Sequence, residues 1–144
     1  MRLRCCHRGG PRAAFGTSQA SSLSPVTLWP GAQYDYTASA GRFVFAAGAC
    51  PLDTDGNVIG PGDFEAQAKQ AVENLRRALA DEGAALADVV KATVYVASSE
   101  RTDLIQVWNV VSPVLGRAPN TLLGVTVLGY PEQLVEIEAI AHLG

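Results

Sequence analysis

Residues 60–84 read GPGDFEAQAKQAVENLRRALADEGA, and this stretch carries the strongest helical signal in the chain. Asp63 is placed to cap the first turn of a helix, and Gly83 is placed to end it. Oppositely charged residues four positions apart lie on one side: Glu65 with Lys69, and Glu73 with Arg77. The other side carries apolar residues at helical spacing: Phe64, Ala68, Ala71, Val72, Leu75 and Leu79. We therefore expect this helix to cover a sheet.

The residues before this helix have the composition of β-strands. Residues 26–53, VTLWPGAQYDYTASAGRFVFAAGACPLD, are rich in β-branched, aromatic and small side chains. Turn signals divide them, so we expect strands near 26–28, 33–39 and 42–48. The dipeptide Asp-Gly at 55–56 then suits a tight turn.

A strand and a second helix follow the first helix. Residues 87–98, ADVVKATVYVAS, predict a strand with Val90, Val94 and Val96 on one side. Residues 102–116, TDLIQVWNVVSPVLG, predict a helix that is capped by Thr102 and ended early by Pro113. We expect its buried residues to be Leu104, Val107, Trp108 and Val111.

Two further strands close the chain, NTLLGVTVLG at 120–129 and QLVEIEAIAH at 133–142. Strict alternation in the second strand separates its side chains onto two faces. One face carries Val135, Ile137, Ala139 and Ala141. The other carries Leu134, Glu136, Glu138, Ile140 and His142. Two carboxylates are therefore neighbours on one face of a strand.

This order of elements predicts an α+β fold, in which two helices pack on one face of a mixed sheet. Nothing in the chain is left to cover the other face. A sheet with a second apolar face usually buries it against another subunit. We therefore expect the chain to associate with itself.

Charge and composition exclude several classes of function. Residues 1–24 are basic and lack the pattern of a secretory signal, so we expect either a disordered extension or an over-long start that the mature protein lacks, followed by a single domain at 25–144. The whole chain has 14 acidic residues, all after residue 34, against seven basic residues there, which argues against nucleic acid as a partner. No apolar run is long enough for a membrane span. The three cysteines, Cys5, Cys6 and Cys50, do not form a disulfide framework, and a cytoplasmic location is expected.

The sequence offers few groups for nucleophilic or metal chemistry. Its two histidines are His7 and His142, and no Gly-x-Ser-x-Gly or His-Glu-x-x-His motif is present. Glu138 and His142 would stand about 13 Å apart on an extended strand, too far to share a metal. No metal or cofactor is expected. For Glu136 and Glu138 two interpretations stay open, a solvated strand face or a pocket carboxylate at a subunit boundary.

Residues 117–141, RAPNTLLGVTVLGYPEQLVEIEAIA, resemble the C-terminal signature of the Rid (YjgF/UK114) family. That signature joins an apolar strand, a proline-containing turn and a hydrophobic-Glu-Ile sequence. VVKATVYVASSERTDLIQVW and GRFVFAAGACPLDTDGNVIGPGDFEAQAKQAVENLRRAL are similar to earlier family segments, in the same order. The resemblance covers roughly residues 26–142.

The resemblance implies a chorismate-mutase-like (YjgF/Rid-like) fold and a homotrimer whose sheets form a central barrel. It also implies that small-molecule pockets lie in the clefts between subunits. The best-known activity of the family is hydrolysis of reactive enamines and imines to 2-keto acids and ammonia. In that reaction an arginine binds the substrate carboxylate and a glutamate helps to position the attacking water.

The family's site residues carry over to this sequence only in part. The glutamate falls on Glu136, the pocket tyrosine on Tyr34 and the strand glycine on Gly48. The pocket asparagine of the second helix falls on Trp108, and the arginine position is held by Asn120. These five residues are the expected ligand-binding residues, with Glu136 as the candidate catalytic group.

The asparagine at position 120 decides the functional expectation. An arginine offers a charged fork that binds a carboxylate in two places, whereas an amide is neutral and shorter. We expect a divergent homotrimer that binds a small metabolite without the standard deaminase activity. The alternative is an enamine or imine deaminase of the 2-iminobutanoate/2-iminopropanoate type with a rearranged site.

Overall fold

The computed structural model describes residues 28–144. In chain order its elements are β1 (Thr37–Ala40), β2 (Phe43–Ala49), α1 (Phe64–Asp81), a 3-10 turn (Leu86–Asp88), β3 (Val89–Val96), α2 (Arg101–Leu115), β4 (Asn120–Gly124) and β5 (Val135–His142). The expected basic extension, residues 1–24, lies outside the described residues, as does most of the strand expected near 26–28.

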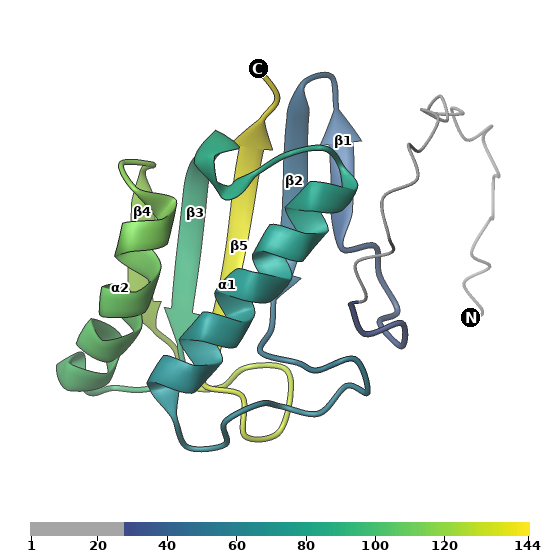
Figure 1. The fold of residues 1–144 in the computed structure, drawn as a ribbon. Helices are drawn as coiled ribbons and strands as arrows, with labels where there is room; N and C mark the ends of the chain where they lie inside the picture. Colours follow the sequence, from purple (N-terminus) through teal and green to yellow (C-terminus); the bar gives the residue numbers. More distant parts are fainter. Residues whose placement is uncertain (1–27) are drawn as a thin grey trace, which may run out of the picture.

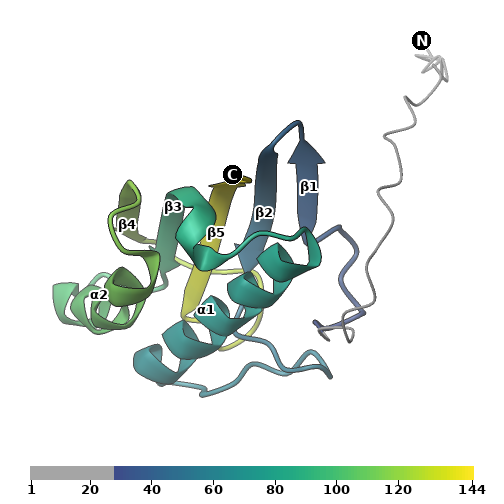
Figure 2. The ribbon, with the colours of Figure 1, turned by 45° about the horizontal axis from the view of Figure 1, so that its top comes forward.

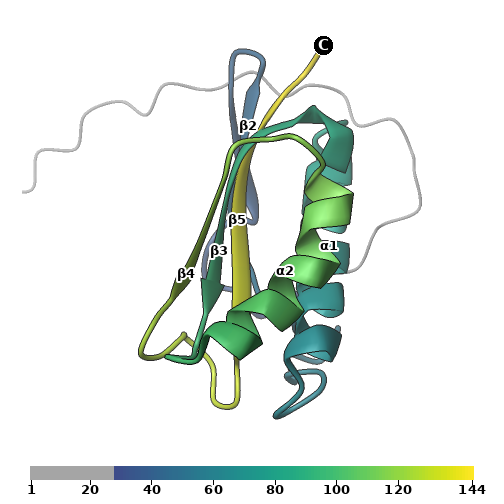
Figure 3. The same ribbon diagram turned by 90° about the vertical axis from the view of Figure 1, so that its left-hand side faces the viewer.

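The strands form one mixed sheet in the order β1-β2-β5-β3-β4, with β5 at its centre (Figure 1). All neighbouring strands are antiparallel except β3 and β4, which are parallel because α2 returns the chain to the same end of the sheet. Figure 3 shows α1 and α2 on the same side of the sheet, and Figure 2 shows them next to each other. The expected α+β fold is therefore confirmed.

The first helix lies where its apolar spacing predicts. The side chain of Asp63 accepts a hydrogen bond from the Ala66 amide at 3.0 Å and so caps the first turn. Leu75 and Leu79 are fully buried in the core between α1 and the sheet. Both expected charge pairs form on the outer side of the helix: Glu65 with Lys69 and Glu73 with Arg77.

Two of the predicted strands differ from the observed ones. β1 begins only at Thr37, so most of the strand expected over 33–39 is a bent segment. In β3, Val90 is 43% exposed and does not share the buried side of Val94 and Val96. The cause is a register shift against β5 between Val89 and Lys91, which inserts one extra residue.

The second helix also departs from its predicted ends. Its N-cap is Glu100 rather than Thr102, and the Glu100 amide donates to the Ser98 hydroxyl at 3.0 Å. The prediction that Pro113 ends the helix is wrong, because α2 continues to Leu115. A proline this close to the C-terminus removes only one of the last helical hydrogen bonds. The buried residues of α2 are Val107, Val111 and Leu115, whereas Leu104 and Trp108 are only partly buried.

The face of the sheet opposite the helices is left open by residues 28–144 (Figure 3). Phe43 and Phe45 on β2 are 44% and 43% exposed, although they are large and apolar. Neither helix in this part of the chain has both the length and the hydropathy needed for a bilayer span. Exposed aromatic side chains on a sheet face are typical of a protein interface.

Candidate functional site

Glu136 lies near the centre of the sheet, where an irregularity in the neighbouring strand leaves room for its side chain. β2 pairs with β5 as Ala46 with Ala139 and Ala49 with Ile137, so β2 carries one extra residue between these pairs. Such bulges reorient side chains and are common beside active sites. This bulge turns Gly48 toward the Glu136 carboxylate, and a Cβ atom at Gly48 would overlap Glu136 Oε1. A glycine is therefore needed here for close approach.

The carboxylate of Glu136 is held on one oxygen only. Oε2 accepts a hydrogen bond from Gln133 Nε2 at 3.0 Å and faces the Cys50 thiol at 3.6 Å. Gln133 is itself buried, and its Oε1 accepts the amide of Tyr130 at 3.0 Å. Among the described residues, no donor reaches Glu136 Oε1 and no cationic side chain pairs with Glu136. One carboxylate oxygen is therefore free for a ligand or a water molecule.

An open pocket of about 640 Å³ lies in front of this carboxylate. Tyr34, Gly48 and Glu136 line it, so the structure brings three of the five predicted site residues together. Cys50, which was not among the five, lines the same pocket. The remaining wall is built by aromatic and small residues and one glutamine: Trp29, Gly31, Ala32, Gln33, Ala47, Gly129 and Tyr130. A pocket of this size suits a small metabolite.

Two neutral groups of this pocket keep their protons under ordinary conditions. Partial burial, followed by the neighbouring phenol of Tyr130, raises the pKa of Tyr34 well above its usual value. Burial, followed by the nearby charge of Glu136, raises the pKa of the Cys50 thiol to about 12. A protonated thiol is a poor nucleophile. Cys50 is therefore a buried structural thiol, and Glu136 carries the charge of the pocket.

Two buried amides on α1 fix the loops on which the pocket is built. Asn74 Nδ2 donates to the carbonyls of Cys50 and Leu52, both at 2.8 Å, directly after β2. Gln67 Nε2 donates to the Glu132 carbonyl at 2.8 Å, and Gln67 Oε1 accepts the Leu134 amide at 2.7 Å, directly before β5. The helix therefore sets the position of the segment that carries Gln133 and Glu136.

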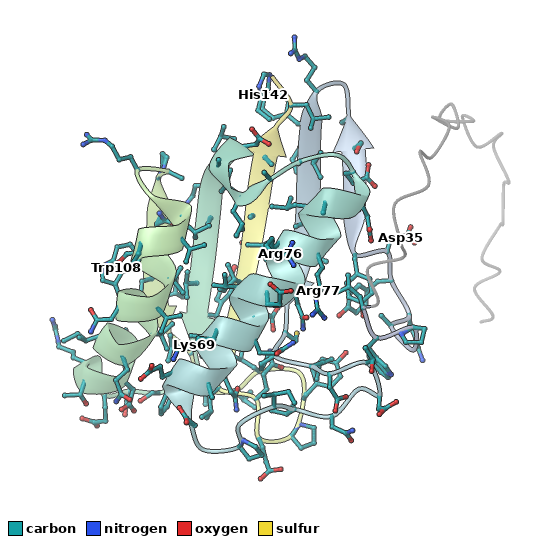
Figure 4. All side chains as sticks on the ribbon, in the orientation of Figure 1. Asp35, Lys69, Arg76, Arg77, Trp108 and His142 are labelled. Atoms are coloured by element: carbon teal, nitrogen blue, oxygen red, sulfur yellow. The ribbon has the colours of Figure 1, made fainter. Side chains whose placement is uncertain are left out.

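The other two predicted site residues, Trp108 and Asn120, do not line this pocket. Trp108 projects from α2 at one side of the molecule, whereas Asp35, next to Tyr34, lies at the opposite side (Figure 4). Asn120 begins β4, the edge strand beside β3, and is paired with Ala92. Its Oδ1 atom is buried and has no hydrogen-bond partner among the described residues.

Glu138, the second carboxylate of β5, belongs to a different environment. Its Oε1 accepts a hydrogen bond from the Tyr95 hydroxyl at 2.8 Å, on the open face of the sheet. It lines a separate hollow with Phe45, Lys91 and Ile140. Within residues 28–144, no three histidine, cysteine or acidic side chains come together as a metal site. The two glutamates thus have different surroundings, although they share a strand face.

Three residues of this site escaped the sequence analysis: Trp29, Tyr130 and Gln133. Trp29 and Tyr130 lie in segments without regular structure, so periodicity gives no signal for them. Their rings contact each other edge to face, with centroids 6.0 Å apart. Gln133 gave no signal beyond its place as the first residue of a predicted strand. Only the fold brings these segments to the same pocket.

The chemistry available here follows from one carboxylate in a mainly apolar pocket. The free Oε1 of Glu136 can accept a hydrogen bond from a ligand or orient a water molecule. The described residues that line the pocket include no lysine, arginine or histidine to bind a carboxylate.

Comparisons with known proteins agree with this fold. The sequence model of a family described as Endoribonuclease L-PSP matches residues 26–143. A RutC family protein from Pyrococcus abyssi is 36% identical over 110 residues, which span 76% of this chain and 85% of that protein.

Solved structures with the same fold include two further relatives. A protein of the conserved Rid family from Yersinia pestis is 35% identical, with a TM-score of 0.65 over 72% of this chain and 80% of that one. A Mycobacterium tuberculosis member of the YjgF/YER057c/UK114 family is 28% identical, with a TM-score of 0.67 over 82% of this chain and 98% of that one.

Proposed function

Because this chain belongs to the Endoribonuclease L-PSP family, which includes the YjgF, Rid and RutC proteins, we propose that it binds a small metabolite between subunits of a homotrimer. It does so without the standard deaminase activity. The ligand contacts the free oxygen of Glu136 and the ring of Tyr34, beside the backbone of Gly48.

One observation carries this proposal above the others. Glu136, Tyr34 and Gly48 line one pocket, and the resemblance assigns the family's glutamate, tyrosine and glycine to them, but it assigns the arginine position to the neutral Asn120. A 2-imino acid carries a carboxylate, and a bidentate guanidinium binds that group far better than a single amide does. Without that charge, binding and orientation of an imino acid are both weak.

The predicted site residues lie in two separate places within one chain, and this separation supports a homotrimer in which neighbouring copies bring them together. Tyr34 and Glu136 lie at one pocket, whereas Asn120 lies at the β4 edge of the sheet. A head-to-tail contact between copies joins two different surface patches, and a ring of such contacts closes the assembly. In that arrangement Asn120 of one copy faces the pocket of the next copy. The exposed Phe43 and Phe45 become buried against the other sheets.

The second candidate is an imine or enamine deaminase with a rearranged site. The free Oε1 of Glu136 favours it, because that oxygen is placed to orient a water molecule. RNA cleavage, which the family's description names, is disfavoured by the surplus of acidic residues over basic ones in the folded part of the chain.

A coupled assay separates the two candidates. A pyridoxal-phosphate-dependent dehydratase generates 2-aminoacrylate, and release of the keto acid is followed with and without this protein. We expect no acceleration by the wild type and a gain of activity in Asn120→Arg. Thr121→Arg is the control, because it places the same charge on the opposite side of β4. Acceleration by the wild type that disappears in Glu136→Ala would establish the deaminase instead.

A further inference from the structure

Three aromatic side chains and one carboxylate surround the pocket at Glu136. Trp29, Tyr34 and Tyr130 supply the rings, and Glu136 supplies the charge. The rings of Trp29 and Tyr130 are in edge-to-face contact at 79°, with centroids 6.0 Å apart, and both line the pocket. Proteins use aromatic rings that line a pocket to hold organic cations, because the face of an aromatic ring is negative.

The aromatic segment is fixed before any ligand arrives. The ring of Trp29 packs directly on the backbone at Gly31 and Gly56, where a Cβ atom would overlap it. The hydroxyl of Tyr36 donates to the carbonyl of Trp29 at 2.6 Å, and the rings of Tyr34 and Tyr36 contact edge to face. A rigid set of rings loses little freedom when a ligand binds.

The charge of the pocket is negative and is not balanced by its own wall. Tyr34 and Cys50 stay protonated, because the pKa values of both are raised. The described residues that line the pocket include no lysine, arginine or histidine, and Glu136 forms no ion pair within residues 28–144. Glu136 Oε1 is left open beside Gly48. A ligand carboxylate placed here would be repelled, whereas a cation would be attracted.

We propose that this pocket selects a small organic cation, an ammonium or iminium compound that carries no carboxylate. The cationic group lies in the pocket against the rings of Trp29 and Tyr130 and faces Glu136 Oε1. This inference rests on the proposed function, because it names the class of ligand for the same cleft. It goes further by reversing the charge preference that an arginine at position 120 would give.

The test compares three probes by isothermal titration: choline, its uncharged carbon isostere 3,3-dimethyl-1-butanol, and 2-oxobutanoate. Choline and the alcohol have the same shape, so their difference in affinity reports the charge alone. We expect choline to bind at least about tenfold more tightly than the alcohol, and 2-oxobutanoate not to compete. Equal affinities, or tighter binding of 2-oxobutanoate, would overturn the cation preference and leave the cleft as a ligand site.

A measurement of the mass of the assembly tests the proposed association of subunits independently of the charge preference of the ligand. If none of the three probes binds, the cation preference is also overturned. Light scattering then decides independently whether the subunits associate. A mass three times the 15.1 kDa of one chain supports the shared cleft, whereas a single-chain mass removes it.

Matched variants test whether the preference for choline comes from the carboxylate of Glu136 and the ring of Tyr130. Glu136→Gln keeps the shape of the side chain, so we expect the alcohol to bind as before and the advantage of choline to fall to about twofold or less. Tyr130→Leu removes a ring and should weaken choline at least about fivefold, whereas Tyr130→Phe keeps the ring and the affinity. Circular dichroism checks that each variant is folded. An unchanged choline preference in Glu136→Gln would contradict the proposal.

Discussion

The site at Glu136 depends on the absence of a side chain at Gly48. The bulge in β2 brings the Gly48 backbone so close to the carboxylate that no other residue fits without displacing it. Gln133 then holds Oε2, and Oε1 is left for the pocket. The carboxylate is thus oriented by neutral groups, which leave its charge available to a ligand.

Gly48→Ala is expected to impair the site without unfolding the protein. The added methyl group forces the end of the flexible Glu136 side chain to move, and a small displacement of a positioned group strongly weakens binding. We expect choline affinity to fall by about tenfold or more in isothermal titration. Gly129→Ala is the control, because it lines the same pocket and its new atom meets nothing closer than Gln133 Oε1 at 3.9 Å. Wild-type affinity in Gly48→Ala would contradict this account of the site.

Cys50 makes stability depend on pH in the alkaline range. In the folded protein its thiol has a pKa of about 12, because of burial and then the charge of Glu136. In the unfolded chain a thiol ionises near a pKa of about 8.5. The unfolded state therefore loses its proton first, so the free energy of unfolding falls as pH rises from about 8.5 toward 12.

This effect is measured by urea unfolding at pH 7.5 and pH 9.5. Between these two conditions we expect the wild type to lose about 1 kcal/mol more than Cys50→Ala, which lacks the buried thiol. The same loss in both proteins would show that the Cys50 thiol ionises as easily in the fold as in solution.

Helix α1 does more than cover the sheet. Gln67 and Asn74 lie on its buried side among apolar residues, and each ties a loop of the site to the helix. A core helix usually avoids such groups unless they are hydrogen-bonded, and these two are. The site is therefore coupled to the most regular element of the fold.

Gln67→Met is expected to destabilise the protein clearly. The substitution keeps the size of the side chain but leaves the Glu132 carbonyl and the Leu134 amide without their partner. Loss of buried hydrogen bonds of this kind costs about 2–4 kcal/mol in the free energy of unfolding, which chemical denaturation measures. Lys69→Met, on the exposed side of the same helix, should change little. Equal effects in the two variants would mean that the buried amide is not structurally important.

The sequence predicts the helices and strands well where one periodic pattern dominates, and less well elsewhere. The apolar spacing of α1 and the alternation of β5 are both confirmed. The bulge at Val90 is not predicted, because an extra residue leaves no mark in the composition of the strand. Pro113 is tolerated because so little of the helix remains after it.

The same limit applies to the candidate site. Glu136, Gly48 and Tyr34 were predicted through the family resemblance, and they meet at one pocket. Trp29, Tyr130 and Gln133 were not, because they come from irregular segments that only the tertiary fold brings together. Trp108 and Asn120 lie away from this pocket within one chain, so their expected roles depend on how copies assemble.

In the molecule as a whole, residues 28–144 cover one face of the sheet and leave the other face open, and the open face predicts how copies assemble. Phe45→Glu places a charge where the proposed trimer buries an aromatic ring, and a buried charge without a partner is strongly unfavourable. We expect this variant to have the 15.1 kDa mass of one chain in light scattering. Ile105→Glu on α2 is the control, because Ile105 is 56% exposed and lies on the helical side. A Phe45→Glu trimer would show that the open face is not the interface.

A crystal structure of the assembled protein soaked with choline chloride tests the central claim most directly. We predict that Asn120 of one copy faces the Glu136 pocket of the next copy, with choline against the rings of Trp29 and Tyr130. Its ammonium group should lie beside Glu136 Oε1. An assembly in which Asn120 is remote from every Glu136, or a pocket that remains without choline, would contradict the account.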